Sequence, residues 1–595
     1  ALTIAANGTL SAPRGNLDLA ANIDNAGAFT HNNGTVRGLD SVYVNQSSSV
    51  AFTFYNWQQA GGQLRFYKDE TIERQLQLDA GASHCYIFSS GGQNVTLTMG
   101  TATNPESSYP KLINNMNTGD KQFWFYAGNE QTATLAGVLE THPIIVTNTN
   151  SSNFQWGYHD NSNAQIKNCD FQFDITLEAD NDRVKLTGDC EFDAFTVGSG
   201  DILNLNGQRM EMSGTLTNNG TIDYDGSLFT PLIDDDGTSN NTATCDLTFT
   251  GSGAYDLNGT YRTLFFNGAA EYNPANTNGL SATNCIIAQG SDGVDLDGTA
   301  QSCTNLTITT GGTLEPNAAT ITVAGDFTTS GGLVNVSAFK GVNGDKDYIK
   351  VVDHADLDVT NTFTLECWFN AGTFSTEEVY LFDRRGGSSG NAKSFYLTMK
   401  TSGALSCRIR GATVSGTTFD SNVTGLNDGK WHHAALVYDK DAADGITKIY
   451  VDGKLDVIND TATGTMTADD SNFYIGGRHS GAATWDGNIA ESRFWSVART
   501  PAQIRADMFN SNTLANNTGL LGQWKMTEGT GSSFASTNSN LNGVAYSNST
   551  GSEVAITDAW AGAGTFTQGT STLVMAKSGT QTFTYNTGGE DVNNL

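Results

Sequence analysis

The sequence is poor in basic residues. It has 31 Lys and Arg against 62 Asp and Glu, a net charge of −31 at pH 7. Nucleic-acid binding needs a basic surface against the phosphates, so this balance argues against a nucleic-acid partner. It argues equally against docking on anionic membranes. Charged residues of both signs make up only 16% of the chain, below the roughly 25% of an average globular domain.

The chain also lacks long apolar runs and metal-type cysteine pairs. No stretch reaches the roughly 18 apolar residues of a transmembrane helix, so we expect no membrane insertion. None of the eight cysteines forms a Cys-x-x-Cys pair, which argues against a zinc site. The sequence begins at Ala1 without an initiator Met or a signal peptide and stops at Leu595, where another strand would begin. We therefore expect the natural polypeptide to continue further.

Proline is scarce, with 8 residues, whereas glycine is abundant, with 66. Asn and Thr are also frequent, and aromatic residues make up 10% of the chain. This composition predicts many short strands joined by tight turns rather than disorder. The one good helix candidate is Pro501–Phe509, where a proline occupies a first-turn position.

A unit that opens on a cysteine recurs in the middle of the chain. Cys245 and Cys285 each precede an apolar strand, a Gly-Ser turn, a short strand and a polar-Gly turn, and Cys190 and Cys303 open variants of the same unit. One such coil cannot bury its apolar face alone, so we predict that coils stack into a solenoid. We expect the cysteines from Cys169 to Cys303 to form an interior ladder of buried thiols. Disulfides are the alternative in an extracellular chain.

A second repeat occurs near both ends. Ala26–Asn56 and Ala563–Asn586 both open on Ala-Gly-x-Phe-Thr and close on Tyr-Asn. We therefore predict that a sandwich domain interrupts a solenoid that resumes after it. A separate β-sandwich is the alternative for the weakly repeating residues 56–170. The predicted divisions are a β-repeat unit (1–60), irregular β-solenoid coils (61–170), a Cys-ladder β-solenoid (171–334), a jelly roll (335–555) and a resumed β-repeat (556–595).

The most informative stretch runs from Asp347 to Met508. Its strand-length segments alternate apolar with polar residues between Gly, Asn and Asp turns, which is typical of an antiparallel sandwich. By the same alternation, Trp368, Trp431, Trp495 and Trp524 are expected in the core. The segments are Phe363–Phe369, Gly429–Asp439, Ile449–Lys454, Phe473–Gly477, Trp485–Trp495 and, further on, Leu520–Gly529.

The order of these segments resembles the laminin-G-like, concanavalin A-like jelly roll over about residues 335–555. The predicted fold class is therefore all-β: parallel β-solenoid repeats interrupted by one antiparallel jelly-roll sandwich. The resemblance implies binding of glycans, proteins or calcium, while some proteins with this fold cleave polysaccharides.

The resemblance also implies where calcium would bind. In the family a calcium ion often lies at the edge of the sandwich, near the first strand and a Phe-x-Gly-x-Ile-Asp-Glu segment. Here those positions offer Asp345, Asp347 and Asp486, and carboxylates near Gly-rich turns suit this ion. Ala490 stands where the family commonly has Asp, which leaves that ligand in doubt.

Glycan binding needs an exposed aromatic side chain beside planar polar groups. Arg478, His479 and Trp485 bracket one long loop, and Arg384 and Arg385 lie in another. We take these five residues as the predicted glycan rim. Alternatively, Trp485 covers the core and does not contact a ligand.

The sequence shows no clustered carboxylates of the kind that glycanases with this fold carry. Glu377 and Glu378 are adjacent, so a strand would point them to opposite faces. Glu191 and Asp193 share a strand face but lack surrounding basic residues. His432 and His433 would also point opposite ways, which argues against one metal ion between them. We therefore expect a protein that is not an enzyme.

The Asn/Gly/Thr-rich style of residues 8–36 resembles structural proteins of marine tailed phages. This resemblance implies a virion appendage or fibre component at the virion surface, which displays the jelly roll to a host-surface glycan. Its expected partners include other virion or fibre subunits and copies of itself, with a homotrimer favoured. A bacterial surface adhesin or matrix fibre protein is the alternative, and a secreted polysaccharide-active enzyme is a third reading.

Overall fold

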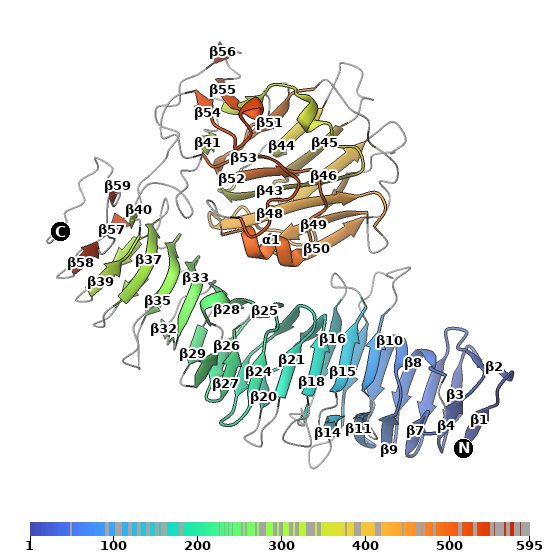
Figure 1. Ribbon diagram of the computed structural model, residues 1–595. Coiled ribbons are helices and arrows are strands. Elements are labelled where there is room, and N and C mark those ends of the chain that lie inside the picture. The colour runs from blue at the N-terminus through green and yellow to red at the C-terminus, as the bar shows by residue number, and fades with distance from the viewer. Residues whose placement is uncertain are drawn as a thin grey trace. The chain divides into compact units, whose positions relative to one another are not determined.

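A computed structural model shows a chain built almost entirely of strands, in two compact units (Figure 1). The first unit contains residues 1–249, with 253–262 and 274–278. The second contains 250–252, 263–273 and 279–595. No helix among the described residues is long and apolar enough to cross a membrane. The structure describes residues 1–47, 50–89, 94–100, 110–116, 122–127, 132–138, 143–148, 154–155, 163–177, 183–224, 226–230, 232–235, 237–240, 242–250, 254–255, 257, 259–267, 270–272, 281–288, 294–296, 301–308, 313–315, 320–325, 327–328, 339–341, 347–374, 378–385, 394–410, 418–442, 446–459, 466, 471–479, 483–509, 514–526, 532–547, 552–553, 565–566, 572–575 and 583–584.

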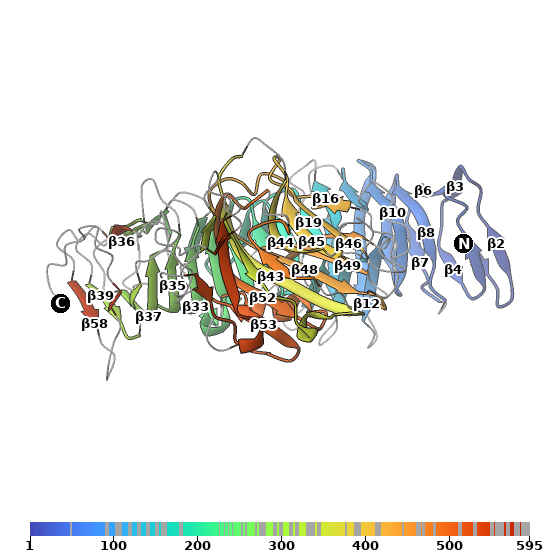
Figure 2. The same ribbon diagram turned by 90° about the horizontal axis from the view of Figure 1, so that it is seen from above.

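The first unit is a stack of parallel strands. One of its sheets follows the order β1, β4, β7, β9, β11, β14, β17, so each strand pairs with its counterpart one coil later. Figure 2 shows strands of successive coils side by side in this unit. We call this sheet the lower sheet. Its strands are β1 (Leu2–Ile4), β4 (Ile23–Asn25), β7 (Val42–Val44), β9 (Gly62–Phe66), β11 (Ala82–Ser89), β14 (Gln122–Ala127) and β17 (Phe154–Gln155).

A longer sheet runs beside it and divides after β10, the first half of which pairs with β12 and the second half with β13. It begins with β3 (Asn16–Leu19), β6 (Thr35–Gly38), β8 (Thr53–Gln59) and β10 (Glu70–Leu78). One series then contains β12 (Val95–Met99), β15 (Thr132–Gly137), β18 (Asn163–Lys167), β21 (Arg183–Leu186), β24 (Ile202–Asn204), β27 (Thr221–Asp223) and β30 (Thr238–Asn240). The other contains β13 (Lys111–Asn114), β16 (Ile144–Asn148), β19 (Cys169–Phe171), β22 (Cys190–Phe192), β25 (Arg209–Met212), β28 (Ser227–Thr230) and β31 (Asp246–Phe249).

Two smaller parallel sheets also lie in the first unit, with a short 3-10 turn η1 (Thr242–Thr244), β32 (Ala254–Tyr255) and the start of β33 (Thr260–Phe266). They are formed by β2 (Thr9–Ser11) with β5 (Ala28–Thr30), and by β20 (Ile175–Leu177), β23 (Phe195–Val197), β26 (Thr215–Asn218) and β29 (Leu232–Asp235).

Apolar side chains of successive coils lie in register inside the stack. Leu97, Leu135, Ile166 and Leu186 are partners on β12, β15, β18 and β21, and all are wholly buried. The residues between them on the same strands face outward and are partly exposed, because side chains alternate along a strand. Each coil thus buries its apolar edge only against its neighbours, as the repeat pattern predicted.

Asparagine residues occupy several corners of the coils. Asn45 and Asn168 adopt positive φ angles of 55° and 51°, a region that Asn tolerates better than most residues. Asn168 Nδ2 also donates a 3.1 Å hydrogen bond to the Gly137 carbonyl of the preceding coil. The Asn-rich composition thus reflects corners that combine a left-handed backbone with a bond between coils.

All eight cysteines are buried free thiols. Cys169 and Cys190 face each other in adjacent coils, but Cys190 is followed in register by Met210. Farther along, Cys285 pairs with Leu306, and Cys303 with Ala282. Among the described strand pairs, the expected cysteine ladder is therefore one pair, because other apolar residues fill the equivalent interior positions.

The second unit contains a parallel stack of its own and the interruption. Strands β38, β39 and β40 pair with β57, β58 and β59, across more than two hundred intervening residues. The interrupted and resumed solenoid of the predicted fold class is confirmed by these pairs. The strands are β34 (Ala270–Tyr272), β35 (Ser281–Ile287), β36 (Val294–Leu296), β37 (Gln301–Ile308), β38 (Thr313–Glu315), β39 (Thr320–Val323), β40 (Phe327–Thr328), β57 (Thr565–Phe566), β58 (Thr572–Met575) and β59 (Phe583–Thr584).

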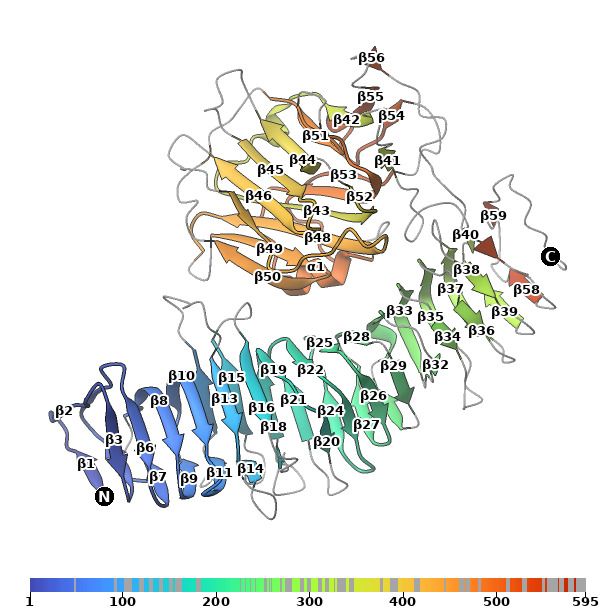
Figure 3. The same cartoon turned by 180° about the vertical axis from the view of Figure 1, so that it is seen from behind.

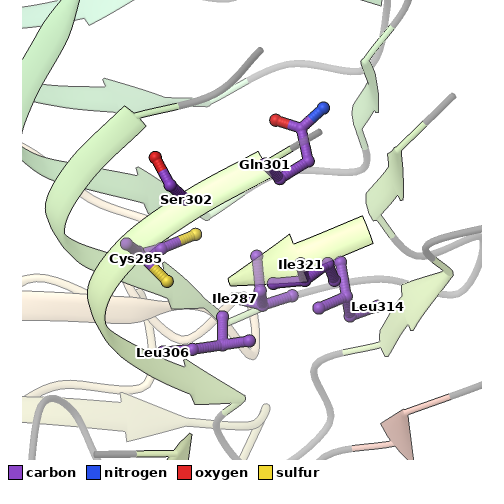
Figure 4. Close-up of a pocket in the computed structure, with 8 residues that line it drawn as sticks. Cys285, Ile287, Gln301, Ser302, Leu306, Leu314 and Ile321 are labelled. Carbon is purple, nitrogen blue, oxygen red and sulfur yellow. The ribbon is translucent and has the colours of Figure 1, made fainter. Parts of the chain in front are cut away.

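A small apolar pocket lies inside this part of the stack (Figure 4). The side chains of Ile287, Leu306, Leu314 and Ile321 point into it, with Cys285 at one side. Burial raises the pKa of the Cys285 thiol well above its usual value. The pocket is therefore a gap in an apolar interior and offers no reactive thiolate.

The inserted domain is a sandwich of two antiparallel sheets (Figure 3). The first contains β41 (Phe339–Gly341), β52 (Gly487–Trp495), β43 (Thr362–Ala371), β48 (Trp431–Asp439), β49 (Thr447–Val451), β50 (Lys454–Asn459) and β53 (Leu520–Trp524). The second contains β47 (Thr418–Asp420), β46 (Leu405–Arg410), β45 (Ser394–Met399), β44 (Val379–Arg385), β51 (Phe473–Ile475), β42 (Asp347–Val351), β55 (Gly543–Ser547), β54 (Ser533–Phe534) and β56 (Ser552–Glu553).

The tryptophans that the alternation predicted to be buried are buried, although Trp368 lies on the outer side of its sheet, where its ring packs on Phe509 and its Nε1 donates to the Met508 carbonyl. Trp368, Trp431, Trp495 and Trp524 are at most 2% exposed. The predicted helix is confirmed as α1 (Pro501–Asp507), which begins with a Thr500–Gln503 capping box. Two 3-10 turns, η2 (Ala355–Leu357) and η3 (Ser539–Leu541), complete the domain.

Candidate functional site

Asp383 is the centre of a polar cluster on the second sheet of the sandwich. Its neighbour Phe382 stacks on Phe473 in the core, at 5.7 Å between ring centres, and Phe473 contacts Phe494 of the opposite sheet. Because successive residues alternate across a strand, Asp383 faces away from the core. Its carboxylate is nevertheless wholly covered.

Two neighbouring side chains cover that carboxylate. Arg385 donates from Nε and Nη2 to Asp383 at 2.6 and 3.2 Å. The backbone N–H of His479 donates at 2.6 Å, and the His479 ring Nδ1 lies 3.1 Å from the same carboxylate. One buried acid therefore fixes the position of a guanidinium and an imidazole, whose side chains remain 18% and 35% exposed.

Two tyrosines flank the guanidinium. The Cζ of Arg385 lies 4.8 Å from the ring centres of both Tyr380 and Tyr396, within the range of cation–π contacts. Burial would lower the pKa of Arg385, but its hydrogen bonds to Asp383 and that carboxylate's charge raise it overall. Burial raises the pKa of Tyr380, against the opposing charges of Arg385 and Arg478. The Arg385 guanidinium thus stays charged and the Tyr380 phenol stays neutral at any physiological pH.

Arg478 completes the cluster. Its charge acts on Tyr380, and its Nε is a buried atom without a hydrogen-bond partner among the described residues. A guanidinium N–H that is buried without a partner is costly unless a ligand or water accepts its hydrogen bond. The structure thus brings together Arg385, Arg478 and His479 of the predicted glycan rim. We call these three, with Asp383, Tyr380 and Tyr396, the Asp383 cluster.

The other two residues of the predicted rim, Arg384 and Trp485, are buried and lie outside this cluster. Arg384 is 4% exposed and bonds Ser471 O at 3.2 Å, the Leu357 carbonyl, and carboxylates of Asp353 and Asp358. Strand alternation explains the difference, because it turns Arg384 inward when Arg385 faces out.

Trp485 is wholly buried. Its ring packs edge-on against Phe369 at 5.6 Å, and its Nε1 donates to the Asn370 carbonyl at 3.3 Å. The ring therefore has no free face for a sugar. Trp485 instead lies against the core, as the alternative interpretation of this residue stated.

The calcium residues are described only in part. Asp345 lies outside the described residues, and only the backbone of Asp347 is described, while Asp486 is partly buried. Within the described part of the chain, no group of three His, Cys, Asp or Glu side chains could hold a metal ion. Calcium binding at these positions stays a prediction.

The remaining candidate groups have structural partners. His432 lies between Asp428 and Asp452, at 3.3 and 2.9 Å. His433 turns to the other face, where its Nε2 lies 3.6 Å from the buried carboxylate of Glu366. In the first unit, Asp193 accepts a 3.1 Å hydrogen bond from Ser213, and Glu377 lies outside the described residues.

Comparison with known proteins locates the family signal in the sandwich. Residues 343–505 match a laminin-G family model described as the concanavalin A-like lectin/glucanases superfamily. This segment is a concanavalin A-like domain. A comparison with curated proteins gives no match.

Solved structures similar to part of this chain are distant in sequence. A Bacteroides ovatus protein proposed to bind carbohydrate is 21% identical over 39% of this chain and 62% of its own, with a TM-score of 0.29. A heptameric SAP-like pentraxin from Limulus polyphemus is 16% identical over 35% and 93%, at 0.25. The CBM40 of a Ruminococcus gnavus IT-sialidase, bound to α2,3-sialyllactose, is 18% identical over 24% and 79%, at 0.21.

Sequence reasoning missed three members of the Asp383 cluster: Asp383 itself, Tyr380 and Tyr396. A bulge at Leu381 shifts the pairing of β44 with β45 between Tyr380 and Phe382. This shift lets Tyr380 and Asp383 share one face although they are three residues apart. The alternation of β45 could have placed Tyr396 outward, but the bulge on β44 leaves no mark in the sequence.

Proposed function

We propose that the chain is an extracellular attachment protein in which a β-solenoid carries a concanavalin A-like domain that binds glycan at the Asp383 cluster. The observation that supports the proposal most directly is the pair of Arg385 and His479, both fixed by one buried carboxylate and both still partly exposed. Groups held in place before binding lose little entropy when a ligand arrives.

The chemistry of the cluster favours a sugar that carries a carboxylate or several hydroxyls. Arg385 and Arg478 offer planar guanidinium donors, which match carboxylate oxygens in pairs. Asp383 already accepts from two residues, so the ligand is expected to meet donors rather than a free acid.

The test is a glycan array with the full chain. We expect His479→Ala to weaken binding about tenfold, on the scale of one lost charge-assisted hydrogen bond. The matched control is His354→Ala, a histidine of the same domain whose side chain is 38% exposed and which pairs with Asp356. Equal binding by both variants and the native chain would remove the Asp383 cluster from the proposal. A parallel array with a chelator tests the predicted calcium.

We further propose that this attachment protein is a virion appendage or fibre component that meets a host-surface glycan and assembles as a homotrimer. A bacterial surface adhesin of the same architecture is the alternative. Capsid or tail genes beside the coding sequence would support the virion, whereas a sorting or secretion domain on the full polypeptide would support the adhesin. Release of reducing ends from a polysaccharide would instead support the third reading, a secreted enzyme.

A further inference from the structure

Three adjacent strands of the lower sheet in the first unit point a row of aromatic and basic side chains outward. Val42 and Val44 of β7, Leu64 and Phe66 of β9, and Cys85 and Ile87 of β11 are wholly buried, so the alternate residues face away from the interior. In register, Tyr43 lies opposite Arg65, and Arg65 opposite Tyr86. We call the following set the outer strip: Tyr43, Arg65, Tyr67, His84, Tyr86 and Phe88.

The side chains of the outer strip touch one another from coil to coil. The Cζ of Arg65 lies 5.2, 4.6 and 5.4 Å from the ring centres of Tyr43, Tyr86 and Phe88. The ring centre of Tyr67 lies 6.0 Å from that of Tyr43 and 4.8 Å from that of Phe88. The result is a continuous row of aromatic side chains that follows the stacking direction across three coils. Tyr86 is only 6% exposed, beneath Arg65, while the other members of the outer strip are partly exposed.

Polar donors lie among these rings. Arg65 Nη2 donates to the Gln63 side chain at 2.9 Å, while Arg65 Nε is buried without a hydrogen-bond partner among the described residues. His84 stacks on Tyr86 at 5.6 Å. Strands β7, β9 and β11 contain no Asp or Glu, although acids outnumber bases two to one in the whole chain.

We propose that the outer strip binds a neutral linear polysaccharide that lies along the stacking direction. Flat apolar rings suit the apolar faces of sugar rings, while Arg65, Gln63 and His84 suit their hydroxyls. Neighbouring strands lie about 4.8 Å apart, a step comparable with one sugar ring, so a chain of sugars meets a member of the outer strip on each coil.

The negative net charge of the protein favours a neutral polysaccharide over two other ligands, a second copy of the chain and an acidic polysaccharide. A second copy of the chain would bring another net charge of −31, and an acidic polysaccharide would meet the same repulsion. A neutral polymer avoids the repulsion and needs no counter-charge. This site lies outside the concanavalin A-like domain, so it stands independently of the glycan site proposed there.

The experiment is affinity electrophoresis of the full chain in gels that contain laminarin or hydroxyethylcellulose, with alginate as the acidic comparison. The test variant is Tyr43→Ala with Arg65→Gln. The matched control is Arg74→Gln, which removes the same charge beside Tyr55, at 5.7 Å from the ring, on the longer sheet of the same unit. We expect the test variant to bind a neutral polymer about tenfold more weakly, while the control binds as the native chain does. His479→Ala is measured beside them.

Three results would overturn the proposal. These are native affinity in the folded test variant, binding that only His479→Ala abolishes, and binding to alginate alone that fades with salt. Circular dichroism and thermal unfolding of each variant separate loss of binding from loss of fold. If the double variant does not fold, Arg65→Gln alone serves, with an expected loss of about threefold. Light scattering tests the remaining occupant, since a change of oligomeric state in the variant without a change in polymer binding would point to a second copy.

Discussion

Two buried ionisable residues of this protein have raised pKa values, one because of its charged partners and the other because of burial. His432 is the clearest case in the concanavalin A-like domain. Its side chain is 12% exposed and pairs with Asp452 and Asp428 at 2.9 and 3.3 Å. Burial alone would lower its pKa, but the charge of Asp452 and the hydrogen bonds of both carboxylates raise the pKa to about 9.

A histidine whose pKa is higher in the folded state stabilises the fold while it is protonated. This contribution to the free energy of unfolding is lost at higher pH, when the proton dissociates. The contribution of His432 is complete below its unfolded value near 6.5 and is lost as the pH rises through about 9. We expect His432→Gln to lower the free energy of unfolding of the domain by about 2 kcal/mol at pH 6 and by little at pH 10. Urea unfolding at both pH values measures this, with His354→Gln as the control. An equal loss at both pH values would assign His432 a packing role only.

Glu70 provides the corresponding case in the first unit. It is 1% exposed and accepts hydrogen bonds from Asn45 Nδ2 at 2.6 Å and from the Phe52 N–H at 2.5 Å. Burial raises its pKa to about 8 despite both bonds. The folded unit therefore holds a proton that the unfolded chain releases above a pH of about 4.5.

Stability of the first unit should consequently fall as the pH rises from about 4.5 through about 8. An amide cannot ionise, so we expect Glu70→Gln to remove a fall on the order of 2 kcal/mol over this window, at the cost of one poorer hydrogen bond at every pH. Chemical unfolding across the pH series, followed by tryptophan fluorescence, measures the slope. Glu73→Gln is the control, since Glu73 lies on the same strand with a partly exposed side chain. A slope that survives Glu70→Gln would have another origin.

At the scale of the element, each strand of the stack is stable only through its neighbours in adjacent coils. β15 shows this plainly, since Leu135 faces inward between Leu97 and Ile166 while Thr134 faces outward. Truncating Leu135 leaves a cavity that the flanking coils cannot collapse to fill, because their own backbones are fixed by the ladder.

We therefore expect Leu135→Ala to cost about 2–5 kcal/mol of the free energy of unfolding of the first unit. Thr134→Ala, one residue away on the outer face, is expected to stay within about 0.5 kcal/mol. Guanidinium unfolding of both variants makes the comparison. Similar values for the two would mean that the inward and outward faces of β15 are not energetically distinct.

The same alternation explains how far the sequence alone leads. Strand-length patterns and turn residues were sufficient for the fold class and for the burial of Trp368, Trp431, Trp495 and Trp524. The strands of three of these residues are buried on both faces, so they are apolar along most of their length. Arg384 and Arg385 were adjacent and chemically equal in the sequence, yet one is inside and one outside. The bulge at Leu381 and the burial of Trp485 depend on the opposite strand and sheet, which a single sequence does not display.

At the scale of the whole molecule, the pairs of β38, β39 and β40 with β57, β58 and β59 have the largest consequence. A domain inserted between two consecutive coils leaves the parallel stack intact only if the chain returns to the same register. The returning strands also cover edges that would otherwise present unpaired N–H and C=O groups.

Deleting residues 556–595 should therefore uncover the edges of β38, β39 and β40 while leaving the inserted domain complete. We expect the shortened chain to self-associate at about 10 µM, because exposed parallel edges template pairing with other chains. Deleting only 586–595 keeps all three returning strands and serves as the control. Sedimentation velocity distinguishes the two. If the shorter chain stayed as dispersed as its control, the returning strands would not protect these edges.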